Sequence, residues 1–320
     1  MSQSATLDGW QVEIEAAIAA LKDRVRRTPL LPSRSMGSDL FLKAENLQVS
    51  GSFKYRPALN AILASGDAAK ERGVVAASSG NFALGVAIAA QQEGVAATLV
   101  AMPSASAFKV ARVEELGAKV VRCDDSYEAR QPMVDQIMAT TGAVELSPHS
   151  FRETIAGGAT TGLEILDESP DIERILVPTS GGGLLAGISL AVALRGSAAE
   201  VIGVQSTGNP AFALSLAARD RQVHPKARTV ADGLVATTPG DLPFQIALQY
   251  VSDVVTVPDT EILEMLRRLA LEESLVVEPS GAAAMAAWAY YERFFSSGKS
   301  TACVLTGGNV APSDWASWIR

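Results

Sequence analysis

The chain has 320 residues, of which 48% are hydrophobic and 19% charged, and its formal net charge is -8. This composition is typical of a globular protein with one large α/β domain or two lobes, and the acidic balance argues against a nucleic-acid-binding protein. Polar residues interrupt the most apolar run, 84–102, too early for a membrane span, and the N-terminus lacks a signal-peptide pattern, so we expect a cytoplasmic protein.

Short apolar runs alternate with helical patterns from about residue 40 onward. In chain order, the sequence predicts strands at 40–43, 74–77, 97–101, 119–122, 175–177, 201–204 and 301–305. It predicts helices at 55–65, from residue 82, and ending near residues 116 and 140. This alternation favours right-handed crossovers and largely parallel sheets covered on both faces. In such sheets, ligands bind where strands end and helices begin.

The stretch VSGSFKYRP, residues 49–57, places Lys54 immediately before a predicted helix. A cation is unfavourable at the positive end of a helix dipole. Lys54 is therefore either an ordinary solvated lysine or an amine that has to lose its proton.

Small and polar residues follow three of the predicted strands. Gly181, Gly182 and Gly183 form a nest of N–H groups suited to a phosphate, or a turn that serves only close packing. The segment 78–81 (SSGN) offers hydroxyls, an amide and N–H groups to a carboxylate, or a simple helix cap. Thr306 precedes two glycines, where its hydroxyl could meet a heteroaromatic nitrogen or have no ligand at all.

In combination, these segments resemble a known family, the fold type II (β-family) pyridoxal-phosphate enzymes, nearest the serine/threonine dehydratase and serine racemase branch. The match follows the order 52–56, 78–81, 181–183, 278–282 and 306–309, over most of the chain. The resemblance implies two open, largely parallel twisted sheets covered by helices, with the cofactor, pyridoxal 5'-phosphate, in the cleft between two lobes. It also implies a large lobe (1–66 plus 146–320), a small lobe (67–145) and a homodimer.

The resemblance also implies roles for individual residues. Lys54 would form the Schiff base with the cofactor and remove the Cα proton, and Ser79 would be the opposed acid/base group in a racemase. Phe53 would lie against the cofactor ring, Asn81 would bind its phenolic oxygen, and Thr306 would meet its pyridine nitrogen. The phosphate would be bound by the backbone N–H groups of Gly181, Gly182, Gly183 and Leu184. The substrate carboxylate would be bound by Ser78, Ser79, Asn81 and Phe82.

A Schiff-base lysine has to react as a neutral amine, although the ordinary lysine pKa is about 10.4. We expect three influences to lower the pKa of Lys54: burial, the helix N-terminus and the nearby charge of Arg56.

The chain departs from the family pattern at several positions. Phe82 and Leu84 replace polar residues that usually follow the SSGN element, and would make an apolar mouth for an aryl or alkyl substituent. The segment 203–211 lacks the two carboxylates that hold a divalent cation in racemase-like members, so we expect no metal site. The chain ends soon after Asn309, so we also expect no C-terminal regulatory domain.

The sequence therefore predicts a dehydratase, or ammonia-lyase, that acts on a β-hydroxy amino acid: serine, threonine, phenylserine or 3-hydroxyaspartate. Arg152 could pair with a distal carboxylate of 3-hydroxyaspartate, or be a solvated arginine at a helix start. Racemisation and β-replacement are alternatives within the family. A catalytically silent amino-acid-binding regulator is an alternative of a different class. We expect neither a nucleic-acid nor a membrane partner.

Overall fold

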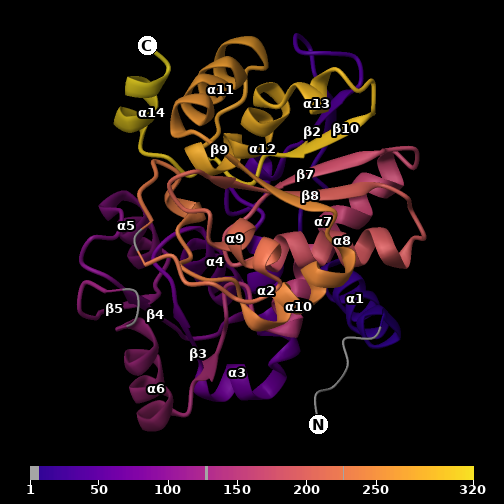
Figure 1. The fold of residues 1–320 in the computed structure, drawn as a ribbon. Coiled ribbons are helices and arrows are strands. Elements are labelled where there is room, and N and C mark those ends of the chain that lie inside the picture. Colours follow the sequence, from indigo (N-terminus) through magenta and orange to yellow (C-terminus); the bar gives the residue numbers. More distant parts are fainter. Residues whose placement is uncertain (1–6, 127–128, 226) are drawn as a thin grey trace.

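The computed structural model describes residues 7–126, 129–225 and 227–320, whose strands form two sheets (Figure 1). The larger sheet has six strands in the order β1-β2-β10-β7-β8-β9, and the smaller sheet has four in the order β5-β4-β3-β6. Among these described strands, β1 pairs antiparallel with β2, and every other neighbouring pair is parallel. The predicted α/β fold with two open, largely parallel sheets is confirmed.

The strand bounds agree closely with the sequence-based prediction. The larger sheet contains β1 (Leu30–Pro32), β2 (Leu40–Lys43), β7 (Arg174–Pro178), β8 (Glu200–Ser206), β9 (Asp253–Val257) and β10 (Thr301–Val304). The smaller sheet contains β3 (Val74–Ala77), β4 (Ala97–Ala101), β5 (Lys119–Arg122) and β6 (Val144–Glu145). Strands β1, β6 and β9 were not predicted.

Helices cover both faces of the larger sheet. One face packs against α11 (Asp259–Glu272) and α12 (Pro279–Tyr290). The short helices α13 (Glu292–Phe295) and α14 (Pro312–Trp318) pack on the same side. The other face packs against α7 (Arg152–Glu168), α8 (Gly183–Leu194), α9 (Ala211–Ala218) and α10 (Asp241–Tyr250). Helix α1 (Leu7–Leu21) forms an outer layer on α7 and α8.

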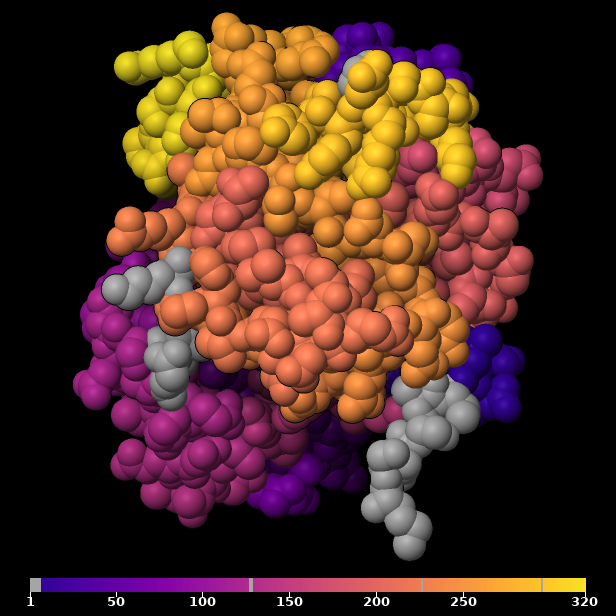
Figure 2. Space-filling model, viewed as in Figure 1, coloured from indigo at the N-terminus to yellow at the C-terminus, as the bar shows by residue number. Residues whose placement is uncertain are grey.

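The smaller sheet also lies between helices. One face packs against α2 (Tyr55–Ala64), α3 (Gly66–Arg72), α4 (Asn81–Glu93) and α5 (Ala107–Glu115), and the other against α6 (Arg130–Thr141). The described ranges also contain two 3₁₀ turns, η1 (Glu45–Leu47) and η2 (Asp232–Leu234). Helix α2 contacts both α4 and α7, so it lies between the two sheet-helix units. Figure 2 shows the salmon and orange segments, near residues 200–250 on the bar, between the smaller sheet's segments in purple and the yellow C-terminal segment.

Prolines mark the starts of helices. Pro57, Pro279 and Pro312 lie in the first turns of α2, α12 and α14. The first N–H groups of a helix have no partner within it, so a proline there removes no hydrogen bond. None of the helices in the described ranges is long and apolar enough to cross a membrane.

Candidate active site

A cavity of about 370 Å³ is lined by residues that follow strands of both sheets. Its walls include the segments that follow β3 and β7, Thr306 after β10, and Lys54 before α2. The fold thus brings strand ends from both sheets to one place, as expected for parallel sheets. The predicted site residues that line the cavity are Phe53, Lys54, Ser78, Ser79, Asn81, Phe82, Gly181, Gly182, Gly183, Leu184 and Thr306.

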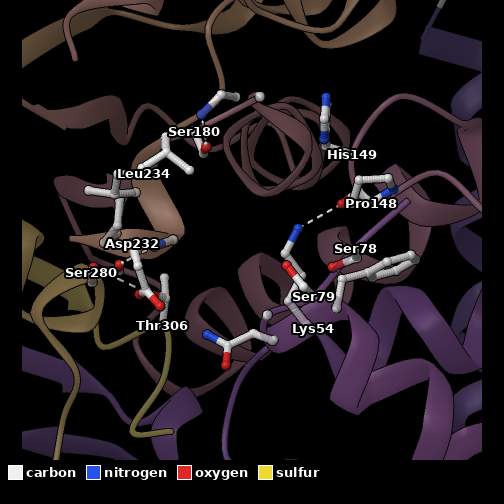
Figure 3. Close-up of a pocket in the computed structure, with 18 of the residues that line it drawn as sticks. Lys54, Ser78, Ser79, Pro148, His149, Ser180, Asp232, Leu234, Ser280 and Thr306 are labelled. Carbon is white, nitrogen blue, oxygen red and sulfur yellow. Dashed lines mark hydrogen bonds between the residues drawn. The ribbon is translucent and has the colours of Figure 1, made fainter. Parts of the chain in front are cut away.

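Lys54 is the residue immediately before α2, and its side chain points into the cavity (Figure 3). Its Nζ donates a hydrogen bond of 2.7 Å to the carbonyl oxygen of Pro148. The rings of Phe53 and Phe82 lie 4.9 and 5.6 Å from Nζ. Burial lowers the pKa of Lys54 to about 8, which makes a neutral amine accessible near physiological pH.

Arg56 is only two residues away, but its guanidinium points away from the cavity into a buried ion-pair network. Arg56 and Glu45 are both fully buried, and their side chains meet at 2.8 Å. Glu164 contacts Arg56 at 2.7 Å and Lys43 at 2.8 Å. These carboxylates compensate the charge of Arg56. The pKa of Lys54 is therefore lowered by burial and not by Arg56, which corrects the sequence-based prediction.

The glycine nest, defined as Gly181, Gly182 and Gly183, connects β7 to α8. Gly182 has a φ of 93°, in the region that side chains with a Cβ rarely adopt. A Cβ there would lie 2.3 Å from the Phe212 ring and 3.0 Å from Pro243. At Gly183, a Cβ would lie 2.8 Å from a backbone oxygen. Backbone N–H groups can thus reach an anion at the N-terminus of α8 only because no side chains intervene.

We expect Gly182→Ala to weaken the binding of pyridoxal phosphate at least tenfold, because the new methyl group collides with Phe212 and reshapes the nest. Absorbance titration of the apo-protein measures this affinity. Gly196→Ala is the matched control, because Gly196 also has a positive φ (61°) but has open space around its Cβ position. Equal affinities in the two variants would exclude the nest as the anion site.

Asn81 and Thr306 are both positioned by hydrogen bonds. Asn81 donates through Nδ2 to Glu278, and its Oδ1 accepts from Asn309 Nδ2 at 3.0 Å. An amide has two N–H donors, so one is left for a ligand. The Thr306 hydroxyl donates to the Ser280 carbonyl at 3.4 Å, and a hydroxyl can also accept a bond from a ligand.

Sequence reasoning missed an ion-pair cluster that joins the two units across the cavity. Lys109 of α5 contacts Glu278 at 2.9 Å, where α12 begins, and Asp232 of η2 at 2.7 Å. Burial alone would lower the pKa of Lys109, but the two carboxylates raise it, so this lysine stays charged. Glu278 lies in the matched segment 278–282, whereas Lys109 and Asp232 belong to no local motif.

Arg152 does not line the cavity. Its side chain pairs with Glu13, and its guanidinium lies 4.0 Å from the centre of the Trp10 ring, in the outer layer formed by α1. The first turn of α7 faces that layer, which sequence position alone does not reveal.

Leu84 is fully buried in the core of the smaller sheet and does not reach the cavity either. Of the two residues predicted to form an apolar mouth, Phe82 therefore lines the cavity and Leu84 does not. Arg130, at the start of α6, does line the cavity.

The cavity fits pyridoxal phosphate in three respects. Lys54 supplies an amine that burial makes reactive. The glycine nest supplies N–H groups that a Cβ would obstruct, which suits a phosphate. Thr306 supplies a neutral hydroxyl on a third wall, suited to the pyridine nitrogen.

Comparisons with known proteins agree with this fit. A family model described as "Pyridoxal-phosphate dependent enzyme" matches residues 21–307. The chain is 39% identical over 307 residues to L-threonine ammonia-lyase of Thermotoga maritima, covering 93% of this chain and 75% of that protein. It is 36% identical to serine racemase of Oryza sativa subsp. indica, covering 93% and 90%.

Solved structures give the same result. The structure of maize serine racemase superposes with a TM-score of 0.90 at 36% identity, covering 96% of this chain and 95% of that one. The chain therefore belongs to the fold type II pyridoxal-phosphate-dependent enzymes, in the branch of the serine/threonine dehydratases and serine racemases.

Proposed function

We propose that this enzyme catalyses the dehydration and deamination of a β-hydroxy amino acid to a 2-oxo acid and ammonia. The observation that carries the proposal is the amine of Lys54, whose pKa burial lowers to about 8, on a cavity wall beside the start of α4. An amine of that pKa can accept a proton near neutral pH. The relative from Thermotoga maritima, named L-threonine ammonia-lyase, supports the same reaction class.

Residues on each wall of the cavity have a role in the proposed reaction. The backbone N–H groups at the start of α4, with the hydroxyls of Ser78 and Ser79, bind the substrate carboxylate. Lys54 takes the proton from Cα and returns a proton to the β-hydroxyl, which leaves as water, and one water molecule then hydrolyses the released enamine to the 2-oxo acid and ammonia. Bound pyridoxal phosphate supplies the electron sink. Thr306 offers a neutral hydroxyl and not a carboxylate, which favours prompt loss of the β-substituent over transamination.

We propose that Arg130, and not Arg152, selects a substrate with a distal carboxylate, such as 3-hydroxyaspartate, because Arg130 lines the cavity. Arg130→Ala is expected to lower kcat/KM for 3-hydroxyaspartate at least tenfold and to change that for serine less than threefold, since a charged hydrogen bond contributes about 1.5–3 kcal/mol. A 2-oxo acid release assay with serine, threonine, phenylserine and 3-hydroxyaspartate measures both values. Arg152→Ala is the control outside the cavity. Equal losses for all substrates in Arg130→Ala would contradict the assignment.

Racemisation is the second candidate, because Ser79 lines the cavity together with Lys54 and a relative is named serine racemase. Chiral analysis of the unreacted substrate separates the two reactions. A dehydratase leaves only the L-isomer, whereas a racemase accumulates the D-isomer. Turnover of any of these substrates would also exclude the silent regulator.

We also propose the division into a small lobe, 67–145, and a large lobe formed by the rest of the chain. Strand membership supports it, since β3, β4, β5 and β6 all fall within 67–145. A homodimer is proposed on the resemblance alone, and light scattering of the purified protein would test it.

A further inference from the structure

His149 lines the cavity but has no part in the proposed reaction. It follows Pro148, whose carbonyl oxygen accepts the Lys54 hydrogen bond, in the segment between β6 and α7 (Figure 3). A Cβ built on Gly181 would lie 2.2 Å from Cδ2 and 2.4 Å from Nε2 of His149. The imidazole therefore occupies the space that a side chain at residue 181 would fill, directly beside the glycine nest.

The imidazole lies on the cavity wall. Among the residues that the structure describes, none makes a hydrogen bond to either of its ring nitrogens. A neutral imidazole has one N–H donor and one acceptor nitrogen, and protonation turns both into donors. Two hydrogen-bonding positions beside the nest are thus left for a ligand.

The charges around His149 are mostly positive. Lys54 faces it from the start of α2, Arg130 from the start of α6, and Arg221 from the segment after α9. Asp241, at the start of α10, is paired with Arg221. Burial, followed by these three cations, lowers the pKa of His149 to about 3, so the imidazole is neutral when no anion is present.

We propose that His149 is a phosphate-binding side chain of this pocket, and that it takes up a proton when a dianion occupies the glycine nest. The dianion offsets the surrounding positive charge and accepts a hydrogen bond from the imidazolium, and both effects favour the charged form of histidine. The dianion belongs to the cofactor, because the chain is a member of a pyridoxal-phosphate-dependent family. This inference rests on the family and not on the proposed dehydration.

The proposal predicts a pH dependence with a definite sign. Below the pKa of His149 in the complex, each bound dianion brings one proton with it, so affinity rises as pH falls, by up to tenfold per pH unit. Above that pKa no proton is taken up, and this contribution to the pH dependence disappears. Lys54 contributes little below its own pKa of about 8, because it is then already protonated in the empty pocket.

Sulfate is a suitable first probe, because it remains a dianion across the relevant range and contributes no proton of its own. We expect isothermal titration of the wild-type apo-protein, in two buffers of different ionisation enthalpy between about pH 6 and 8, to show an uptake approaching one proton per sulfate. We expect His149→Asn to show no such uptake and to bind sulfate at least tenfold more weakly at the lower pH. His149→Phe gives a second variant, and thermal unfolding of the apo-proteins checks their folding.

Two control experiments identify which group takes up the proton and which part of the ligand causes the uptake. A Lys54→Met background is expected to keep the proton uptake, which would assign it to His149 and not to the amine. Pyridoxal, which lacks the phosphate, is expected to bind wild type and His149→Asn equally, whereas pyridoxal phosphate is expected to distinguish them. Equal proton uptake and equal sulfate affinity in wild type and His149→Asn would overturn the proposal. None of these equilibria depends on turnover, so failure of the dehydratase assignment would leave them unaffected.

Discussion

Lys54→Ala is expected to lower kcat/KM for the preferred β-hydroxy amino acid by about 10⁴-fold or more, because the variant loses both the covalent attachment of the cofactor and the base at Cα. A 2-oxo acid release assay measures the loss. Absorbance of the loaded protein reports the loss of the covalent bond independently. Lys70→Ala, which changes an exposed lysine of α3, is the matched control and should retain full activity. A Lys54→Ala enzyme with wild-type turnover would contradict the assignment.

The lowered pKa of Lys54 predicts how the rate of cofactor binding depends on pH. Only the neutral amine reacts with the cofactor's aldehyde, so the rate of cofactor capture by the apo-protein should rise with pH up to about 8 and then level off. An ordinary lysine would keep gaining rate up to a pH of about 10.4. A stopped-flow series over this range distinguishes a lysine in the buried cavity wall from a solvated one.

Arg56→Met is expected to lower the free energy of unfolding by about 3–5 kcal/mol, because Glu45 would be left fully buried without its cation. Urea denaturation followed by circular dichroism measures the change. The matched control is Arg195→Met, since Arg195 pairs with Asp167 at the surface, with side chains 49% and 40% exposed. Removing that surface pair should change stability by about 0–1 kcal/mol.

The double variant Glu45→Gln/Arg56→Met tests whether the unpaired charge of Glu45 causes the loss of stability in Arg56→Met. Removing the negative charge together with its partner should recover part of the stability lost in Arg56→Met, because no unpaired charge remains at residue 45. A double variant less stable than Arg56→Met would contradict the unpaired-charge argument. Since Arg56 lies in the first turn of α2, its loss should also disturb the orientation of Lys54.

The fold could be predicted from the sequence where strands are apolar and bounded by small residues. Strands β2, β3, β4 and β5 were predicted with the bounds that the structure shows. Strands β1 and β6 have three and two residues, too few for a periodic pattern to be recognised. Strand β9 reads DVVTV, a run too short for periodicity to distinguish a buried strand from part of a helix.

The candidate site could be predicted where its residues lie in contiguous motifs. Lys54, the segment 78–81 and the glycine nest were singled out by their order along the chain, which resembles that of the family, and all three line the cavity. Lys109 and Asp232 are 123 positions apart and meet only after folding. The sequence left Arg152 open between a substrate contact and a solvated arginine, because its helix lies near the site, and in the structure its side chain faces α1.

Helix α2 contacts a helix of each sheet-helix unit, α4 on one side and α7 on the other. Lys54 lies immediately before this helix, so contacts with both units hold its backbone in place. Ser78, Ser79 and Lys109 belong to the segments around the smaller sheet, whereas the glycine nest belongs to the larger one. Any change in the separation of the two units would therefore change the distance between these opposite walls of the cavity while leaving Lys54 in contact with both units.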